Sequence, residues 1–74
     1  MMPTEILSNE EKVIIINQHV RTLEYSLYNI ELDILEAESD DTPDTALISG
    51  KTLALAEVQR KIDALNAEKA ALES

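Results

Sequence analysis

The sequence predicts an all-α fold: a two-helix antiparallel coiled-coil hairpin that dimerises into a four-helix bundle. Two long segments repeat apolar residues at alternating spacings of three and four, which is the coiled-coil pattern. A short acidic segment separates them, and a short connection places neighbouring helices antiparallel. The chain has 74 residues and no cysteine. A single domain of this size has a small core, so we expect self-association or a partner protein to stabilise it.

The first helix is expected over residues 8–38, after a short flexible arm at residues 1–7. Ser8-Asn9-Glu10-Glu11 is a capping-box pattern. In this motif the Ser8 hydroxyl accepts from the amide of Glu11, and the Glu11 side chain accepts from the amide of Ser8. The apolar repeat that follows consists of Val13, Ile16, Val20, Leu23, Leu27, Ile30 and Ile34, with Ala37 in the next position.

Residues 39–42 are expected to form an acidic turn, and the second helix to span residues 43–73. Thr42 is the expected N-cap, Pro43 suits the first helical position, and Asp44 is favourable near the positive end of the helix dipole. The second repeat consists of Ile48, Lys51, Leu55, Val58, Ile62, Leu65, Lys69 and Leu72. The two lysines can lay their stems on apolar surface while their amines reach water.

The two repeats fit each other in an antiparallel register. If facing residues have numbers that sum to 85, Leu23 faces Ile62 and Leu27 faces Val58, and every position of one repeat meets a position of the other. The centre of this register falls between Thr42 and Pro43, at the expected turn. We therefore predict that these two repeats form the seam of the hairpin.

The first helix carries more apolar residues than the seam needs. The additional residues occupy heptad positions b and f, so their stripe is centred roughly 150° from the seam at about 100° per residue. They are Ile14, Tyr25, Tyr28, Leu32 and Leu35. Contiguous exposed apolar residues mark interaction sites, and tyrosine combines an apolar ring with a polar end. We expect this stripe to be an interface, either between copies of the chain, with a dimer favoured, or with another protein.

The turn is the most acidic part of the sequence. Its carboxylates do not have the spacing of an EF-hand loop and lack the glycine of that motif. A solvated turn is therefore the expected state, with no metal site. The alternative function places the activity here: Asp40, Asp41 and Asp44 would let the protein act as a modulator or inhibitor of a host enzyme by occupying a basic cleft.

Composition excludes several other classes of function. The formal net charge is −9, which disfavours nucleic acids and anionic membranes as partners. The longest unbroken apolar run, residues 13–16, is far shorter than a membrane span of about 20 residues. We find no phosphate-binding loop and no nucleophile-elbow context, and the only histidine is His19. We expect no catalytic residues and no cofactor, and a cytoplasmic protein.

Three segments resemble short uncharacterised proteins of tailed phages that infect marine cyanobacteria. They are Ile16-Asn17-Gln18-His19, Leu23-Glu24-Tyr25-Ser26-Leu27-Tyr28, and the Thr42-Pro43-Asp44 break before an Ala/Leu-rich helix. The resemblance covers most of the chain and implies no activity and no site residues. It implies a viral accessory or assembly protein that acts on a phage or host protein in the cytoplasm of an infected bacterium.

Overall fold

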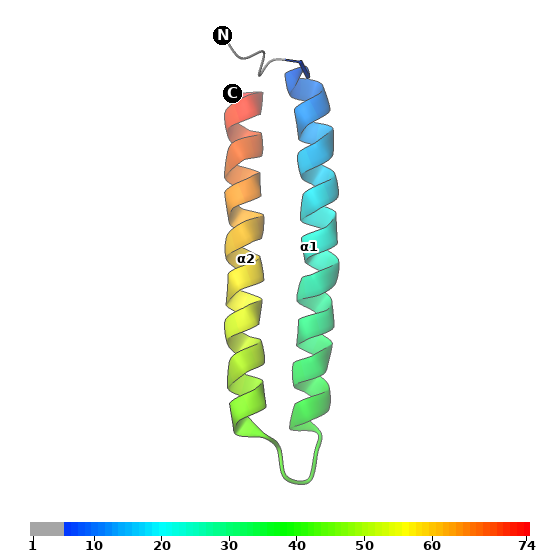
Figure 1. Cartoon of the computed structure of the whole chain (residues 1–74), viewed down its shortest axis with the longest axis vertical. Coiled ribbons are helices and arrows are strands. Elements are labelled where there is room, and N and C mark those ends of the chain that lie inside the picture. Colours follow the sequence, from blue (N-terminus) through cyan, green and yellow to red (C-terminus); the bar gives the residue numbers. More distant parts are fainter. Residues whose placement is uncertain (1–5) are drawn as a thin grey trace.

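The computed structural model describes residues 6–74, which form an antiparallel hairpin of two α-helices without strands in that range (Figure 1). Helix α1 spans Asn9–Glu38 and helix α2 spans Thr45–Glu73. The molecule is elongated, with extents of 59 × 20 × 18 Å. The predicted all-α hairpin is confirmed. Most of the expected arm, residues 1–5, lies outside the described residues.

Helix α1 begins with the predicted capping box. The Ser8 hydroxyl accepts from the Glu11 amide at 3.1 Å, and the Ser8 amide donates to Glu11 Oε1 at 2.9 Å. At the other end, the Ser39 amide donates to the Leu35 carbonyl at 3.1 Å, and the Ser39 hydroxyl donates to the Glu36 carbonyl at 2.7 Å. No basic residue lies in the last turn of α1. The helix therefore has no positively charged side chain of its own to stabilise the negative end of its dipole.

Helix α2 begins two residues later than predicted. Its N-cap is Asp44, not Thr42, and the Asp44 carboxylate accepts from the amide of Leu47 at 3.1 Å. Pro43 therefore precedes the helix instead of occupying its first position. The physical reason is that aspartate is at least as good an N-cap as threonine. Thr42 and Asp44 are both possible N-caps in this segment, and Asp44 is the one that bonds to the helix backbone.

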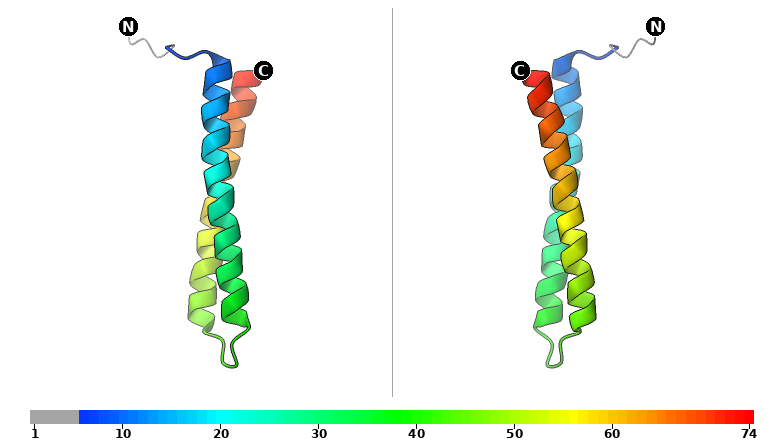
Figure 2. Two further views of the ribbon diagram at one scale, coloured as in Figure 1. Left: turned by 90° about the vertical axis from the view of Figure 1, so that its right-hand side faces the viewer. Right: turned by 90° about the vertical axis from the view of Figure 1, so that its left-hand side faces the viewer.

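The seam lies where the two repeats predict it. Within residues 6–74, Ile16 and Ile62 are the buried hydrophobic residues, with 9% and 6% of their surface exposed. The remaining fourteen seam residues are half-buried. The two helices cross at a shallow angle and stay side by side along their length (Figure 2). The hairpin therefore has a narrow core only one layer of side chains thick.

Two lysines bridge the helices in the predicted register. Lys51 Nζ lies 3.1 Å from Asp33 Oδ2, and Lys69 Nζ donates to Asn17 Oδ1 at 3.3 Å. The residue numbers of the two pairs sum to 84 and 86, so each pair sits within one residue of the predicted register. Both lysines are half-buried: their stems lie along the seam, and their amines bond to α1 at its edges.

The open end of the hairpin is also tied across the two helices. The Asn9 side chain donates to the carbonyl of Leu72 at 3.2 Å. That carbonyl belongs to the last turn of α2, where backbone oxygens have no partner within the helix. The N-terminus of α1 thus helps to satisfy the C-terminus of α2, beside which it lies (Figure 1).

Candidate protein-interaction surface

The stripe predicted on the first helix lies on α1 and is largely uncovered. Tyr25 and Tyr28 each expose 61% of their surface, Leu35 exposes 62% and Ile14 exposes 57%. Leu32 is half-buried. It lies between Tyr28 and Leu35 on the helix surface, and it lines a groove that also contains Leu55 of the second helix. The stripe therefore presents two tyrosine rings and several aliphatic side chains to solvent.

Four of these five residues form one continuous patch. Tyr25, Tyr28, Leu32 and Leu35 follow one another at spacings of three, four and three, and we call them the tyrosine patch. Ile14 is separated from them, because Gln18 and Arg21 occupy the intervening positions of the row. Ile14 lies near the open end instead, where it lines a surface groove of about 410 Å³ together with Val13, Leu72 and neighbouring polar residues.

The surface beside the tyrosine patch includes part of the second helix. A groove of about 460 Å³ runs along its edge, lined by Tyr28, Glu31, Leu32, Ile34, Leu35, Glu38 and Leu55. Leu55 comes from α2 and was predicted only as a seam residue. Its second role follows from how the helices are rotated against each other, which the repeat does not specify. The result is an apolar surface with a groove beside it, flanked by carboxylates.

Arg21 marks the N-terminal end of the patch. Its guanidinium carbon lies 5.0 Å from the centre of the Tyr25 ring, and its Nη1 lies 3.5 Å from Glu24 Oε1. Interactions with Tyr25, and secondly with Glu24, raise the pKa of Arg21 above its ordinary value. Sequence reasoning did not single out this residue. The available signal was its spacing of four residues from Tyr25, which places a cation beside an aromatic ring.

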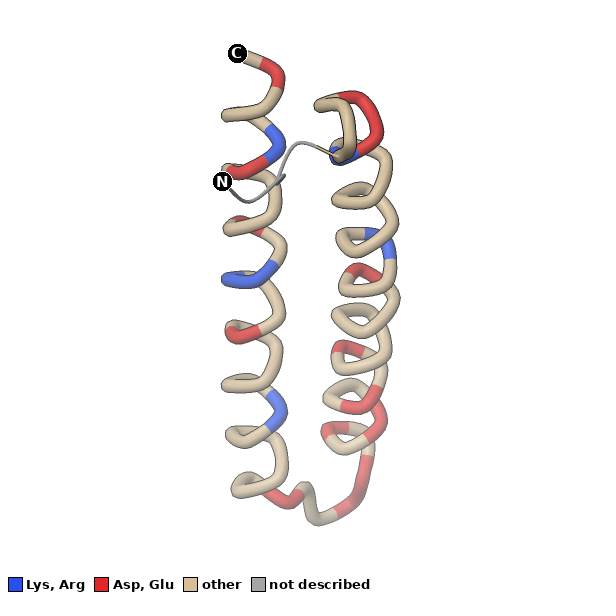
Figure 3. Tube along the Cα trace, turned by 45° about the horizontal axis from the view of Figure 1, so that its top comes forward, with Lys and Arg blue, Asp and Glu red and all other residues tan. Residues whose placement is uncertain are grey.

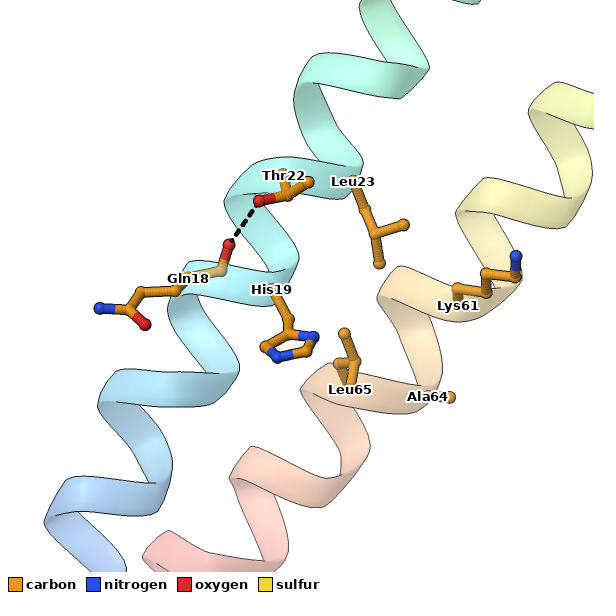
Figure 4. Close-up of a pocket in the computed structure, with 7 residues that line it drawn as sticks. All are labelled: Gln18, His19, Thr22, Leu23, Lys61, Ala64 and Leu65. Carbon is orange, nitrogen blue, oxygen red and sulfur yellow. Dashed lines mark hydrogen bonds between the residues drawn. The ribbon is translucent and has the colours of Figure 1, made fainter.

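A third groove lies between the helices nearer the open end (Figure 4). It has a volume of about 660 Å³ and is lined by Gln18, His19, Thr22, Leu23, Lys61, Ala64 and Leu65. The His19 imidazole points toward Leu65 on α2, and the Thr22 hydroxyl donates to the Gln18 carbonyl at 3.1 Å (Figure 4). His19 thus flanks the seam, as its heptad position predicts. The groove is open and shallow, and it brings together no second imidazole or carboxylate with His19.

The acidic tip is solvent-exposed. Asp40, Asp41 and Asp44 are all exposed, but Asp44 has a structural role because its carboxylate caps α2. Within residues 6–74, no group of three or more histidine, cysteine, aspartate or glutamate side chains is placed to hold a metal ion. Of the predicted tip residues, Asp40 and Asp41 thus remain as candidates for an outside contact.

Neither helix is long and apolar enough to cross a membrane, over the part of the chain that the structure describes. No protein-family model, no curated protein and no solved structure matches this chain.

Proposed function

We propose that the protein is a non-enzymatic interaction factor that self-associates as a dimer through the tyrosine patch. The observation that carries this proposal is the exposure of Tyr25, Tyr28 and Leu35 on one face, each above 60%. Apolar side chains in a continuous exposed patch mark a contact surface in soluble proteins. Tyrosine is among the residues enriched at such contacts.

The thin core supports a second copy as the occupant. Only Ile16 and Ile62 are buried as hydrophobic core residues of the described chain, and a core of this size gives a marginal fold. An aromatic side chain can bury about 150–250 Å². Two copies of the patch, with four tyrosines and their aliphatic neighbours, reach the order of 1,000 Å², the lower bound for a specific interface. Self-association would thus complete the four-helix bundle.

The setting of this activity follows from the resemblance to short phage proteins. That resemblance supports an accessory or assembly role in the cytoplasm of an infected bacterium. An assembly factor of this kind needs no active site. One face of its dimer can bind the proteins whose assembly it assists. The function therefore lies on exposed surfaces of the helices and not in the grooves.

The test is to place charge in the patch. Tyr28→Glu with Leu32→Glu should convert the dimer into a monomer, because each copy would bury carboxylates against the other. Helicity should fall as well, since the single hairpin has little core. The matched control is Leu53→Glu with Ala56→Glu, which adds the same charge to an exposed face of α2. This control should remain dimeric. Sedimentation velocity and circular dichroism measure the two properties.

The unmodified protein gives an independent readout. Its melting temperature should rise with protein concentration, because association stabilises the folded state by roughly 2.7 kcal/mol over a hundredfold increase. A monomer whose melt does not depend on concentration would contradict self-association. A patch variant that remains as dimeric as the control would contradict association through the tyrosine patch.

A further inference from the structure

The negative charge of the protein is concentrated in one half of the hairpin. Residues 22–50 contain eight of the fifteen acidic residues and none of the six basic ones. This segment is the C-terminal half of α1, the turn and the start of α2, where acids alone mark the chain (Figure 3). The tyrosine patch lies in this half, so the way in which a second copy binds there depends on charge as well as on apolar area.

From this charge and from the layout of the patch, we infer that the second copy packs its α1 antiparallel on the first, about a twofold axis beside Ile30. This inference rests on the proposed self-association and specifies its geometry. In an antiparallel pair, facing residues have a constant sum of numbers, and here the sum is 60. Tyr28 then faces Leu32 of the second copy, and Tyr25 faces Leu35. Each of these contacts occurs twice, as twofold symmetry requires.

The ends of this pairing are complementary in charge. In the same register, Arg21 reaches Ser39 of the second copy, which is the C-cap of α1. The last turn there contains Glu36 and Glu38 and no basic residue. A cation near a helix C-terminus is favourable, because it faces the negative end of the dipole. Arg21 would therefore supply to the other copy the charge that its α1 lacks.

The parallel arrangement lacks this complementarity. It would place Arg21 against Arg21 and each tyrosine against itself. It would also bring both turns to one end, so that Asp40 and Asp41 of the two copies would lie side by side. Like charges in contact are destabilising. The antiparallel arrangement moves the two turns to opposite ends of the assembly, so the charge distribution selects it.

Spin-label distances test this geometry directly. The chain contains no cysteine, so Gln18→Cys and Asp40→Cys each give a single labelling site, and both residues are exposed. In the antiparallel dimer, labels at 18 lie about 36 Å apart along the axes and labels at 40 about 30 Å apart, at about 1.5 Å per residue. In a parallel dimer, each of these distances shortens to about 8–10 Å between helix axes.

A mixed sample provides the converse test. When the two variants are combined in equal amounts, label 18 of one copy should lie near label 40 of the other in the antiparallel dimer. In a parallel dimer the same pair is about 33 Å apart along the axes. Sedimentation of each labelled variant confirms that it associates as the unmodified protein does.

The outcomes separate this inference from the proposed function. Long distances in each single sample and a short one in the mixture support the antiparallel pairing. A dimer without the short distance in the mixture overturns the pairing and leaves self-association standing. A monomer at the labelling concentration overturns both. A dimer that survives Tyr28→Glu with Leu32→Glu and still lacks the short distance would show that the chains associate through another face.

Discussion

Gly50 lies inside α2, where a glycine weakens a helix by its freedom in the unfolded chain. A Cβ added at this position would meet no atom within 4 Å. We therefore expect Gly50→Ala to increase the free energy of unfolding by about 0.5–1 kcal/mol. Urea denaturation at a fixed protein concentration measures this change.

The reverse substitution at a comparable site is the matched control. Ala56 is exposed in the same helix, so Ala56→Gly should lower the stability by a similar amount. If Gly50→Ala and the unmodified protein were equally stable, the start of α2 would not be helical in the folded protein. The tyrosine patch should be unaffected by either change, because both residues lie on the other helix and outside the groove.

The start of α2 depends on one carboxylate. Asp44 accepts from the amide of Leu47, so Asp44→Ala should lower the free energy of unfolding by about 1 kcal/mol, whereas Asp44→Asn should be nearly neutral because asparagine caps equally well. Asp41→Ala, in the exposed turn, is the control for loss of charge. Thermal and urea unfolding of the three variants measure these differences. A loss in Asp44→Asn equal to that in Asp44→Ala would show that charge matters here instead of capping.

The helices were predictable to the extent that they depend on local pattern. The capping box at Ser8 and the sixteen seam positions are encoded by residues three and four apart, and the structure has them where the sequence predicts them. The start of α2 was not predictable from the sequence, because Thr42 and Asp44 are both good N-caps. Nor was the contribution of Leu55 to the groove, since it depends on the rotation of one helix against the other. The proposed contact at the patch is still a prediction.

In the proposed dimer, carboxylates of the two copies would repel one another, and added salt should weaken this repulsion. In the antiparallel register, Glu24 would face Glu36 of the second copy, and Glu31, one residue from the axis, would lie about 3 Å along the helix from its own counterpart. Screening lengths fall from about 10 Å to about 3 Å between about 0.1 and 1 M salt. We therefore expect the dimer Kd to fall as sodium chloride is added, and sedimentation equilibrium measures it.

A neutral variant isolates the electrostatic part of this effect. Glu31→Gln should lower the Kd at low salt roughly two- to fivefold, the range expected for exposed charge pairs. It should also reduce the dependence of the Kd on salt. The matched control is Glu57→Gln, on the exposed part of α2 outside the interface. A Kd that rises with salt would mean that attraction by Arg21 outweighs the repulsion between carboxylates.

The bond between Asn9 and Leu72 keeps the start of α1 and the end of α2 together at one end of the hairpin. The tyrosine patch lies in the opposite half, so in the proposed antiparallel dimer the two copies would overlap only near the patch, and both open ends would project outward. Their Asn9 residues would then lie on the order of 60 Å apart, at about 1.5 Å per residue. Such an assembly is a bivalent spacer: whatever binds or is fused at an open end is presented twice, in opposite directions and at a fixed separation.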